Sequence, residues 1–467
     1  MTPIKLPDVS TDRAYYSIDP LDSRYYDPLV ARYLSERSRI AFQAYVEAAL
    51  ASALADVGIC TPEIAEQIEA AAGQISAEAV YAEEQTTKHD IKAIVNCIKK
   101  QLPEAAQPYV HFGATSYDII STASALQLRT TVQELILPRL RELLQTLLTL
   151  TKDHADTNQI GRTHGQHAVP ITFGFAMAEY VSRLGENMQA LDDLSHQLKG
   201  KFSGAVGAYN ALSIFVDDPM VFEKNLLSKV GLEPAPYATQ IVPAEAVIRL
   251  MDELTISAGI MANLAHDMRH LQRTEIAEVR ERFESGQTGS STMAHKRNPW
   301  NFENIISMSK QVTAQMLNAN LNISSEHQRD LTDSASSRFY AVSLGCVASM
   351  LARLNTVMSK LEVDTEHMQR NLYLTDGAIA AEPLYLLLEK YGHSSAHEAA
   401  KLIAHSALEA GVSLFAAAEK DTAISSFWQQ LTAQEREYIK NPESTYTGLA
   451  AKKAMIIHDY WQSKIGD

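Results

Sequence analysis

The sequence predicts a mainly α-helical protein with a bundle of long helices at its centre. Residues 243–284 contain Gly259 as their only glycine and no proline after Pro243, and apolar residues recur there at spacings of three and four. This spacing is typical of one face of a helix. It predicts a helix of about forty residues, well beyond the roughly 8–20 residues usual in globular proteins. Strand-like alternation is scarce along the chain.

The remaining elements follow from the same pattern. Four further stretches predict long helices: 119–156, 173–199, 304–322 and 335–361. Pro138 should bend or interrupt the first, because proline has no N–H to donate within a helix. Helices of this length need neighbours along their whole length, which indicates a bundle or an oligomer. We therefore expect three domains: an N-terminal helical domain (1–117), a central long-helix bundle (118–364) and a C-terminal helical domain (365–467).

Composition narrows the class of function. The 467 residues carry 41 basic and 56 acidic side chains, a net charge of −15, so neither nucleic acid nor an anionic membrane is an expected partner. A small anionic substrate can still bind a locally basic pocket. The three cysteines, Cys60, Cys97 and Cys346, lie far apart, which suggests neither a disulfide framework nor a zinc site. Residues 1–10 show no signal-peptide run, and no long apolar stretch predicts a membrane span, so we expect a cytoplasmic protein.

Two polar, glycine-containing stretches are candidates for catalysis. Residues 285–299 form a polar stretch before a helix expected to start near Trp300 or Asn301, and such a loop can close over a substrate. The alternative is a solvated linker. Residues 161–170 place His164 and His167 around a glycine in an expected turn, where either imidazole can act as acid or base. A metal pair is less expected there, because no carboxylate lies at ligand spacing, and a purely surface role stays open.

Three other stretches are candidates for binding. In residues 86–90 and 111–118, polar side chains precede expected helices, so they can bind an anion, cap the helix, or do both. For example, Asp90 can act as a cap. Residues 326–338 predict a helix that starts near Asp333 or Ser334 with Ser334 and Arg338 on one face, which would suit a phosphate or carboxylate. The alternative is an ordinary capped helix with solvated arginines.

Two histidines and two absent motifs give less evidence about the function. His266 and His270 lie four residues apart, but the glutamate of H-E-x-x-H is missing, so we interpret them as polar positions on one helix face. Neither the P-loop pattern nor the G-x-G-x-x-G pattern occurs in the sequence.

Together these stretches resemble the fumarase/aspartase superfamily of elimination enzymes. Residues 289–298 match its hallmark loop G-S-S-x-M-P-x-K-x-N, except that Ala294 replaces the proline and is expected to loosen the loop. Six motifs in order resemble the adenylosuccinate lyase family within it: D-S-R-Y at 22–25, K-H-D at 88–90, T-S-x-D at 115–118, T-H-G-Q at 163–166, K-R-N-P at 296–299 and Q-R-D-L-T-D-S at 328–334. The last, completed by Arg338, is the most discriminating.

The resemblance implies a fold, an assembly and a reaction. The implied fold has three mostly helical domains, and its central helices form the core of a homotetramer with four active sites, each built from more than one subunit. The implied reaction is anti β-elimination of fumarate from adenylosuccinate to give AMP, and from SAICAR to give AICAR, in purine nucleotide biosynthesis. Neither a cofactor nor a metal is expected.

The resemblance also implies catalytic roles. Ser290 is the base, and Ser291 is a less favoured base and a substrate ligand. Because a serine hydroxyl is a poor base, Lys296 and loop amides are expected to stabilise its alkoxide. Lys296 and Asn298 are expected to hold the succinyl carboxylate, where negative charge develops in the reaction.

The general acid implied by the T-H-G match is His164, which protonates the leaving nitrogen. Glu303 is expected to orient it, and His167 is the rival acid. The nucleotide phosphate is assigned to five residues: Arg24, Tyr25, Arg329, Ser334 and Arg338. The other substrate contacts are assigned to eight residues: Lys88, His89, Asp90, Thr115, Ser116, Gln240, Arg297 and Asn304.

Other functions stay open as alternatives. Argininosuccinate lyase or another lyase of the superfamily shares the chemistry, but argininosuccinate has no phosphate to bind the assigned arginines. A non-enzymatic, crystallin-like relative would be favoured by loss of the base, acid or lysine, yet Ser290, His164 and Lys296 are all present. A metal-dependent hydrolase is least expected, because the sequence shows no ligand cluster.

Overall fold

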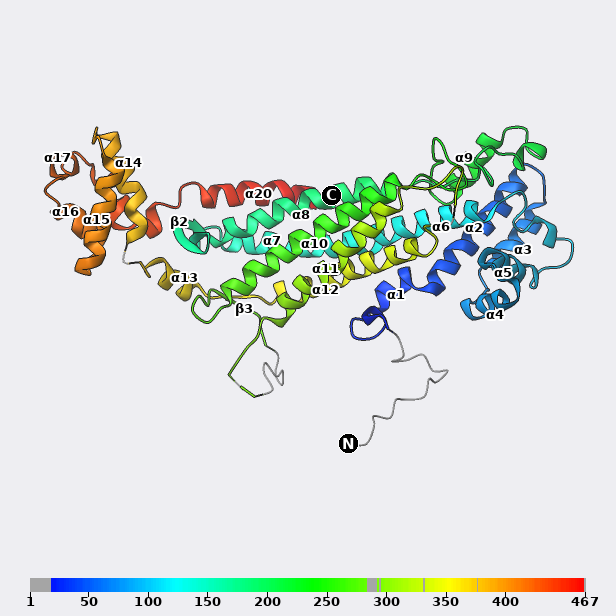
Figure 1. Ribbon diagram of the computed structural model, residues 1–467, viewed down its shortest axis with the longest axis horizontal. Coiled ribbons are helices and arrows are strands. Elements are labelled where there is room, and N and C mark those ends of the chain that lie inside the picture. The colour runs from blue at the N-terminus through cyan, green and yellow to red at the C-terminus, as the bar shows by residue number, and fades with distance from the viewer. Residues whose placement is uncertain (1–17, 284–291, 294, 331, 376, 466–467) are drawn as a thin grey trace. The chain divides into compact units, whose positions relative to one another are not determined.

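The computed structural model describes residues 18–465 apart from 284–291, 294, 331 and 376. Helices dominate, and the described residues include four short strands, which confirms the mainly helical fold class (Figure 1). The chain forms two compact units. Unit 1 comprises Met1–Leu140, Asn187–Gly259 and Ser307–Ala352, and unit 2 comprises Arg141–Glu186, Ile260–Ile306 and Arg353–Asp467. The division into three domains stays a prediction.

Long helices form in all five stretches where the apolar spacing predicted them. They are α7 (Leu137–Asp153), α8 (Phe173–His196), α10 (Glu245–Leu271), α11 (Trp300–Leu321) and α12 (Tyr340–Met358), and each contributes residues to both units. α11 starts at Trp300, as expected. The short 3₁₀ helix η5 (Ser336–Phe339) leads into α12. The stretch Ser336–Met358 is apolar enough to cross a membrane, but 67% of that window is buried inside the protein, which suits a core helix.

Two of these helices depart from a regular rod. The prediction of about forty helical residues from Pro243 was wrong, because α10 ends at Leu271. The chain there turns through Ala277, whose φ is +55°, and the Glu278 N–H donates back to the Leu271 carbonyl at 2.9 Å. The predicted interruption at Pro138 is confirmed. A π turn (Val132–Ile136) separates α6 (Ser116–Thr131) from α7 just before the proline, which cannot donate a helical hydrogen bond.

Unit 1 packs short helices around α2 (Glu36–Asp56). α2 contacts five helices: α1 (Pro28–Leu34), α3 (Pro62–Ala72), α4 (Ala77–Thr87), α6 and α9 (Pro219–Lys229). Its buried side chains, including Ile40, Val46, Leu50 and Leu54, supply the core of this part. α5 (Asp90–Lys99) packs on α3, α4 and α6, so the starts of α5 and α6 belong to the same unit.

Unit 2 contains a β-hairpin and the C-terminal helices. Strands β1 (Asn158–Thr163) and β2 (Gln166–Thr172) are antiparallel, and β3 (Val279–Arg280) pairs with β4 (Glu362–Val363). The helices of this unit that follow β4 are α13 (Thr365–Leu372), α14 (Ala381–Lys390), α15 (Ala396–Ala410), α16 (Leu414–Lys420), α17 (Ser425–Trp428), α18 (Ala433–Lys440), α19 (Pro442–Thr445) and α20 (Ala450–Ile465). A separate apolar cluster, which includes Leu384, Ile403 and Trp428, joins α14 to α18.

A buried ion pair supports the start of α6 in unit 1. Lys201 and Asp118 are both fully buried and form an ion pair. Asp118 also accepts hydrogen bonds from the N–H of Gly204 at 3.2 Å and of Thr115 at 2.9 Å. Lys201 donates to the Gly204 carbonyl at 3.1 Å. The pair therefore holds the 115–118 motif against the 201–204 segment.

Replacing Lys201 by Met should lower the free energy of unfolding by about 3–5 kcal/mol, because it leaves the Asp118 carboxylate buried without its counter-charge. Urea denaturation followed by circular dichroism measures this loss. The matched control is Lys199→Met, whose partner Glu233 lies 3.2 Å away at the exposed surface. That control should cost less than about 1 kcal/mol. Equal losses in the two variants would contradict the assigned role.

Candidate functional site

Two arginines of the 326–338 stretch and two aspartates form a charged cluster in unit 1. The Arg338 guanidinium lies 3.7 Å from the Asp90 carboxylate, and Arg329, whose side chain is almost fully buried, forms an ion pair with Asp333. Arg329 Nε is buried and has no hydrogen-bond partner among the described residues. Its backbone φ of 147° lies in a region that favours glycine. Backbone strain and an unsatisfied buried donor are expected where an anionic ligand binds.

The starts of α5 and α6 lie beside each other in unit 1. His89 Nε2 is 3.4 Å from Ser116 Oγ. His89 also caps α5, accepting the Lys92 N–H at 3.4 Å, so the suggestion that Asp90 is the cap was wrong. Thr115 and Asp118 form a capping box at α6, so helix capping there is confirmed. Free N–H groups at such helix starts attract anions.

The other residues of unit 1 that the sequence predicted to bind substrate lie at several places in the unit. The Gln240 N–H donates to the Gln328 carbonyl at 3.0 Å, so Gln240 lies next to the arginine stretch. Ser334 lies in a turn before η5, so the helix starts slightly later than expected. Lys88 ends α4 with φ +52°. Arg24 is exposed on the turn after the 3₁₀ helix η1 (Pro20–Asp22), where the Tyr25 N–H donates to the Pro20 carbonyl at 2.9 Å.

In unit 2, the predicted turn with two histidines is the tip of the β1–β2 hairpin. His164 and Gly165 are the two turn residues, with φ of +54° and +74°, which is the geometry of a type I′ turn. The strands of this hairpin were not predicted, because strand-like alternation is scarce in the sequence. His164 is exposed at the tip. Gly161 sits at an irregularity in the register, and a Cβ there would lie 2.7 Å from the Val169 carbonyl oxygen.

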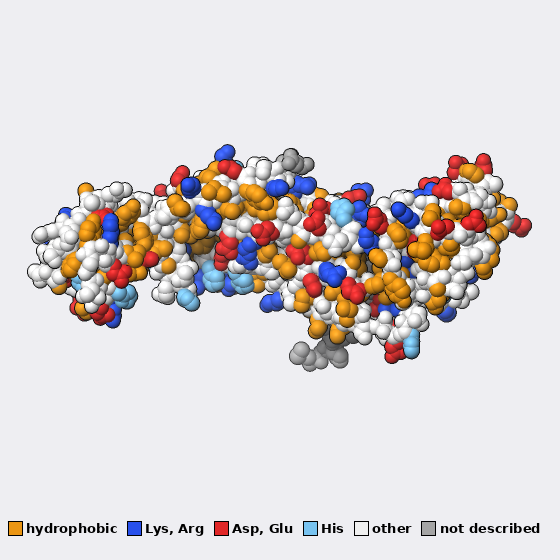
Figure 2. Space-filling view, turned by 90° about the horizontal axis from the view of Figure 1, so that it is seen from above, with side chains coloured by type: hydrophobic (Ala, Val, Ile, Leu, Met, Phe, Trp, Pro, Cys, Tyr) orange, Lys and Arg blue, Asp and Glu red, His pale blue; other side chains and the backbone are white. Residues whose placement is uncertain are grey.

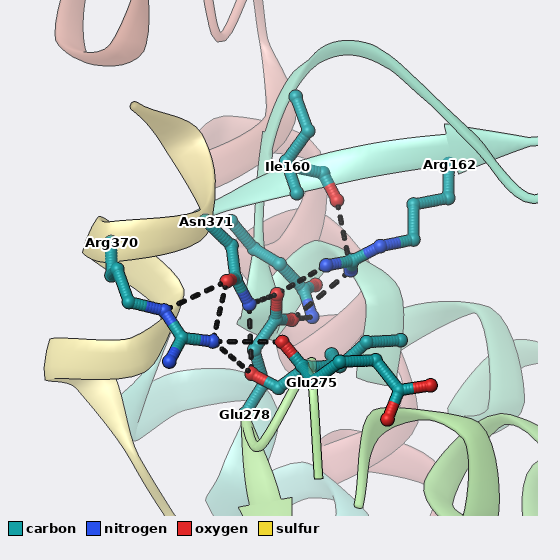
Figure 3. Close-up of polar contacts among 8 residues, drawn as sticks. Ile160, Arg162, Glu275, Glu278, Arg370 and Asn371 are labelled. Atoms are coloured by element: carbon teal, nitrogen blue, oxygen red, sulfur yellow. Dashed lines mark hydrogen bonds and ion pairs between the residues drawn. The ribbon is translucent and has the colours of Figure 1, made fainter. Parts of the chain in front are cut away.

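A buried carboxylate anchors the base of this hairpin (Figure 3). Glu278 is fully buried and accepts hydrogen bonds from Gln159 at 2.8 Å, from Arg162 at 2.5 and 3.2 Å, and from Asn371 at 2.8 Å. Asn371 lies on α13, and Arg370 beside it donates to the Asn371 side chain and to two backbone carbonyls. One carboxylate thus joins β1, α13 and the segment that follows α10.

The lysine of the hallmark loop lies in a basic cleft of unit 2. The cleft has a volume of about 940 Å³. The side chains that line it and bear on the argument are Arg269, Arg273, Arg280, Lys296, Arg297 and Asn298. Lys296 and Asn298 therefore face a space that fits a small anion. Ser290, Ser291 and Ala294 lie outside the described residues.

The expected partnership of His164 with Glu303 does not occur within one chain. Glu303, at the start of α11, is 3.5 Å from Arg269, whereas His164 is exposed. The two side chains make no hydrogen bond or ion pair with each other in the described part of this chain. Asn304, the next residue on α11, is half-buried. The orienting role of Glu303 stays a prediction.

A second cleft in unit 2, of about 950 Å³, is lined by Gly165 and His167. Burial lowers the pKa of His167, and the nearby Arg162 lowers it further. His270, interpreted from the sequence as a polar position on one helix face, lines both clefts, and so does Arg273. The lowered pKa favours the neutral imidazole of His167, which can both donate and accept a hydrogen bond.

Sequence reasoning missed Glu278 and a second buried carboxylate, Glu281. The sequence contains one indication of a buried carboxylate in this segment. Glu275 and Glu278 follow Leu271 by four and seven residues, so they continue the apolar spacing of α10 with acidic side chains. Charged residues at such positions indicate either the end of the helix or a buried polar network.

The sequence and the fold match known lyases. A family described as Lyase matches residues 25–314, and one described as Adenylosuccinate lyase C-terminal matches residues 325–435. The 3-carboxy-cis,cis-muconate lactonizing enzyme from Pseudomonas putida has a TM-score of 0.85 and 28% identity, covering 96% of this chain and 100% of that chain. A fumarate lyase from Mesorhizobium sp. BNC1, with a TM-score of 0.83, 24% identity and coverage of 93% and 98%, shares the fold. The family match and the fold together define a lyase of the fumarase/aspartase superfamily.

Sequence relatives narrow this class. The adenylosuccinate lyase of Pyrococcus abyssi is 37% identical over 450 residues, covering 95% of this chain and 98% of that protein. The adenylosuccinate lyase of Methanocaldococcus jannaschii is 33% identical over 444 residues, covering 93% and 94%. The chain belongs to the adenylosuccinate lyase family.

The loop that carries Thr115 and Ser116 should respond to pH through His111. Its Nδ1 lies 2.7 Å from the buried carboxylate of Glu47. Burial alone would lower the pKa of His111, but the Glu47 charge outweighs it, and the net shift is upward. A raised pKa in the folded state means that the pair stabilises the fold fully below the unfolded value of about 6.5 and loses this effect as pH rises through the folded value.

We therefore expect His111→Asn to reduce the free energy of unfolding more at pH 6 than at pH 9. Asparagine tolerates the +63° φ of this position, so backbone strain should not confuse the comparison. Urea unfolding of both proteins across this range gives the difference. A gap that is constant with pH, or that widens above pH 7, would refute the pairing.

Proposed function

We propose that the chain catalyses elimination of fumarate from adenylosuccinate, giving AMP. The observation that carries this proposal is the 33–37% identity to adenylosuccinate lyases over more than nine-tenths of the chain. A second support is the charged cluster of unit 1, where the buried Arg329 Nε has no hydrogen-bond partner among the described residues, because a nucleotide substrate brings a phosphate that can accept from it. The related solved structures include a lactonizing enzyme, so the fold alone does not define the reaction.

The chemistry requires cations where charge develops. A base removes the proton next to a succinyl carboxylate, and the electrons load that carboxylate with extra negative charge. Lys296 and Asn298 line the basic cleft and are the groups proposed to stabilise this charge. The C–N bond then breaks, and the purine nitrogen leaves with a proton from an acid on the opposite face.

Ser290 is the proposed base and His164 the proposed acid. His164 is exposed at the tip of a hairpin that Glu278 anchors, so it can reach a site built with another subunit. In such a site Glu303 of one subunit would orient His164 of another. Ser291 would bind substrate through its hydroxyl.

The remaining substrate contacts are proposed mostly for residues of unit 1. Arg329, Arg338 and Ser334 would hold the phosphate, together with Arg24 and Tyr25. The other substrate contacts are proposed for Lys88, His89, Asp90, Thr115, Ser116, Gln240, Arg297 and Asn304. SAICAR, which carries the same succinyl group and phosphate, is proposed as a second substrate.

A cytoplasmic homotetramer is the proposed assembly. Leu317, Leu321 and Ile323, at the end of α11, are each more than half exposed, and hydrophobic side chains lie between charged ones on the face seen in Figure 2. Exposed apolar side chains on a long helix favour helix packing between subunits. Central helices of residues 118–364 would then form the shared core.

Replacing either proposed proton-transfer residue should slow turnover. Ser290→Ala and His164→Gln should each lower kcat by about 10²–10⁴, the usual contribution of a general acid or base, with little change in KM. Steady-state kinetics on the purified variants measures this. The control is His266→Gln, on an exposed turn of α10, which should keep wild-type turnover. Near-normal kcat in Ser290→Ala or His164→Gln removes that residue from its role.

The phosphate assignment predicts a substrate-dependent defect. Arg338→Met should lower kcat/KM for adenylosuccinate by roughly 10- to 100-fold, as expected for losing a charged hydrogen bond of about 1.5–3 kcal/mol. The same variant should match wild type with succinyladenosine, which has no phosphate. Arg37→Met, at an exposed ion pair with Glu78, serves as control. An equal defect with both substrates would mean that Arg338 does not bind the phosphate.

The proposed function itself is tested by substrate choice. Purified protein is given adenylosuccinate or argininosuccinate in parallel, and fumarate release is followed. Release from adenylosuccinate alone supports the proposal. Release from argininosuccinate alone transfers the chain to the alternative lyase, and release from neither argues for a non-enzymatic relative.

A further inference from the structure

The two described flanks of the hallmark loop are tied together by one carboxylate in unit 2. Glu281, just before the loop, is almost fully buried. Its Oε1 accepts the N–H groups of Asn301 at 3.1 Å and Phe302 at 3.3 Å, and its Oε2 accepts the Asn301 side-chain amide at 2.6 Å. Asn301 and Phe302 are in the first turn of α11, immediately after the loop.

The sequence of the loop explains why α11 needs this carboxylate. The residue before α11 is Pro299, whose side chain has no acceptor for the first N–H groups of the helix. Glu281 supplies the missing acceptor from the other flank, and its negative charge suits the positive end of the helix. The helix start and the segment before the loop are therefore fixed to each other.

The same hydrogen-bond network extends to the end of the loop that carries Lys296. We call this end of the loop the lysine arm (residues 296–298). Gln272 accepts the Glu281 N–H at 2.9 Å through Oε1 and donates through Nε2 to the Arg297 carbonyl at 3.4 Å. On the far side, Arg353 donates to the Asn301 side-chain oxygen at 2.8 Å and lies 5.0 Å from the centre of the Trp300 ring. The lysine arm is thus held between Gln272 and the capped start of α11.

We propose that Glu281 is a positioning residue, whose carboxylate fixes the lysine arm so that Lys296 and Asn298 meet the substrate carboxylate. Glu281 lines the same cleft as these residues, but its oxygens are committed to three N–H donors. Those bonds leave it poorly placed to transfer a proton. The inference rests on the proposed lyase function.

The sharpest test exchanges the hydrogen-bond donor and acceptor between positions 281 and 301. In Glu281→Gln, Oε1 can still accept from α11, but the new amide faces the Asn301 amide as a second donor. In Asn301→Asp, two carboxylates face each other. In the double variant, the new amide at position 281 donates to the new carboxylate at position 301. That carboxylate still accepts from Arg353, and the net charge of the pair is unchanged.

We expect each single variant to lower kcat by about 10- to 100-fold with a smaller change in KM, because displacement of a catalytic group by about 1 Å costs on that order. The double variant should recover to within about threefold of wild type. It carries no carboxylate at position 281, so recovery also excludes Glu281 as a proton donor. Glu362→Gln, an exposed carboxylate on β4, is the matched control and should keep wild-type kinetics.

Two results would overturn the proposal. One is a folded Glu281→Gln variant with wild-type turnover, and the other is a folded double variant no faster than Glu281→Gln. Circular dichroism and size-exclusion chromatography establish folding and assembly for each variant. If Glu281→Gln does not fold, Gln272→Met decides, because it frees the Arg297 carbonyl while the carboxylate stays. Normal kcat in Gln272→Met would then leave Glu281 a purely structural role. Inactive wild-type protein would refute the lyase function instead.

Discussion

Burial of two carboxylates three residues apart is the constraint on which unit 2 depends. Glu278 and Glu281 follow the end of α10, and each is removed from water. A buried carboxylate is tolerated only when several donors surround it. Those donors come from β1 and α13 for Glu278 and from α11 for Glu281. One short segment therefore fixes both the hairpin that carries His164 and the arm that carries Lys296.

Unit 1 also contains buried charged side chains, both carboxylates and cations. Asp118 is buried against Lys201 and also caps α6, so the polar start of that helix is rigid. Arg329 is buried as well, but its Nε has no hydrogen-bond partner among the described residues. The Asp118–Lys201 pair builds structure, whereas Arg329, although paired with Asp333, keeps a buried N–H that an anion can accept. In both units the long helices supply rigidity, and most candidate site residues lie at helix ends or in the segments that connect helices.

Sequence patterns predicted the helices well because apolar spacing reports directly on a buried helix face, as α8 and α11 illustrate. They failed where local backbone geometry decides. The spacing continues past Leu271, although α10 ends there and the chain then turns through the left-handed residue Ala277, and the polar hairpin around His164 offers no alternation to detect. Motif resemblance supplied most candidate site residues. It could not reveal Glu281, whose hydrogen-bond partner Asn301 is distant along the chain and visible only after folding.

A succinylated purine nucleotide is proposed to lose fumarate at this site. Ultraviolet absorbance after adding adenylosuccinate to purified, metal-stripped protein tests this reaction most directly. We expect a fall in the succinyl-purine band, with AMP and fumarate formed in equal amounts. An unchanged spectrum from protein shown to be folded and tetrameric would contradict it.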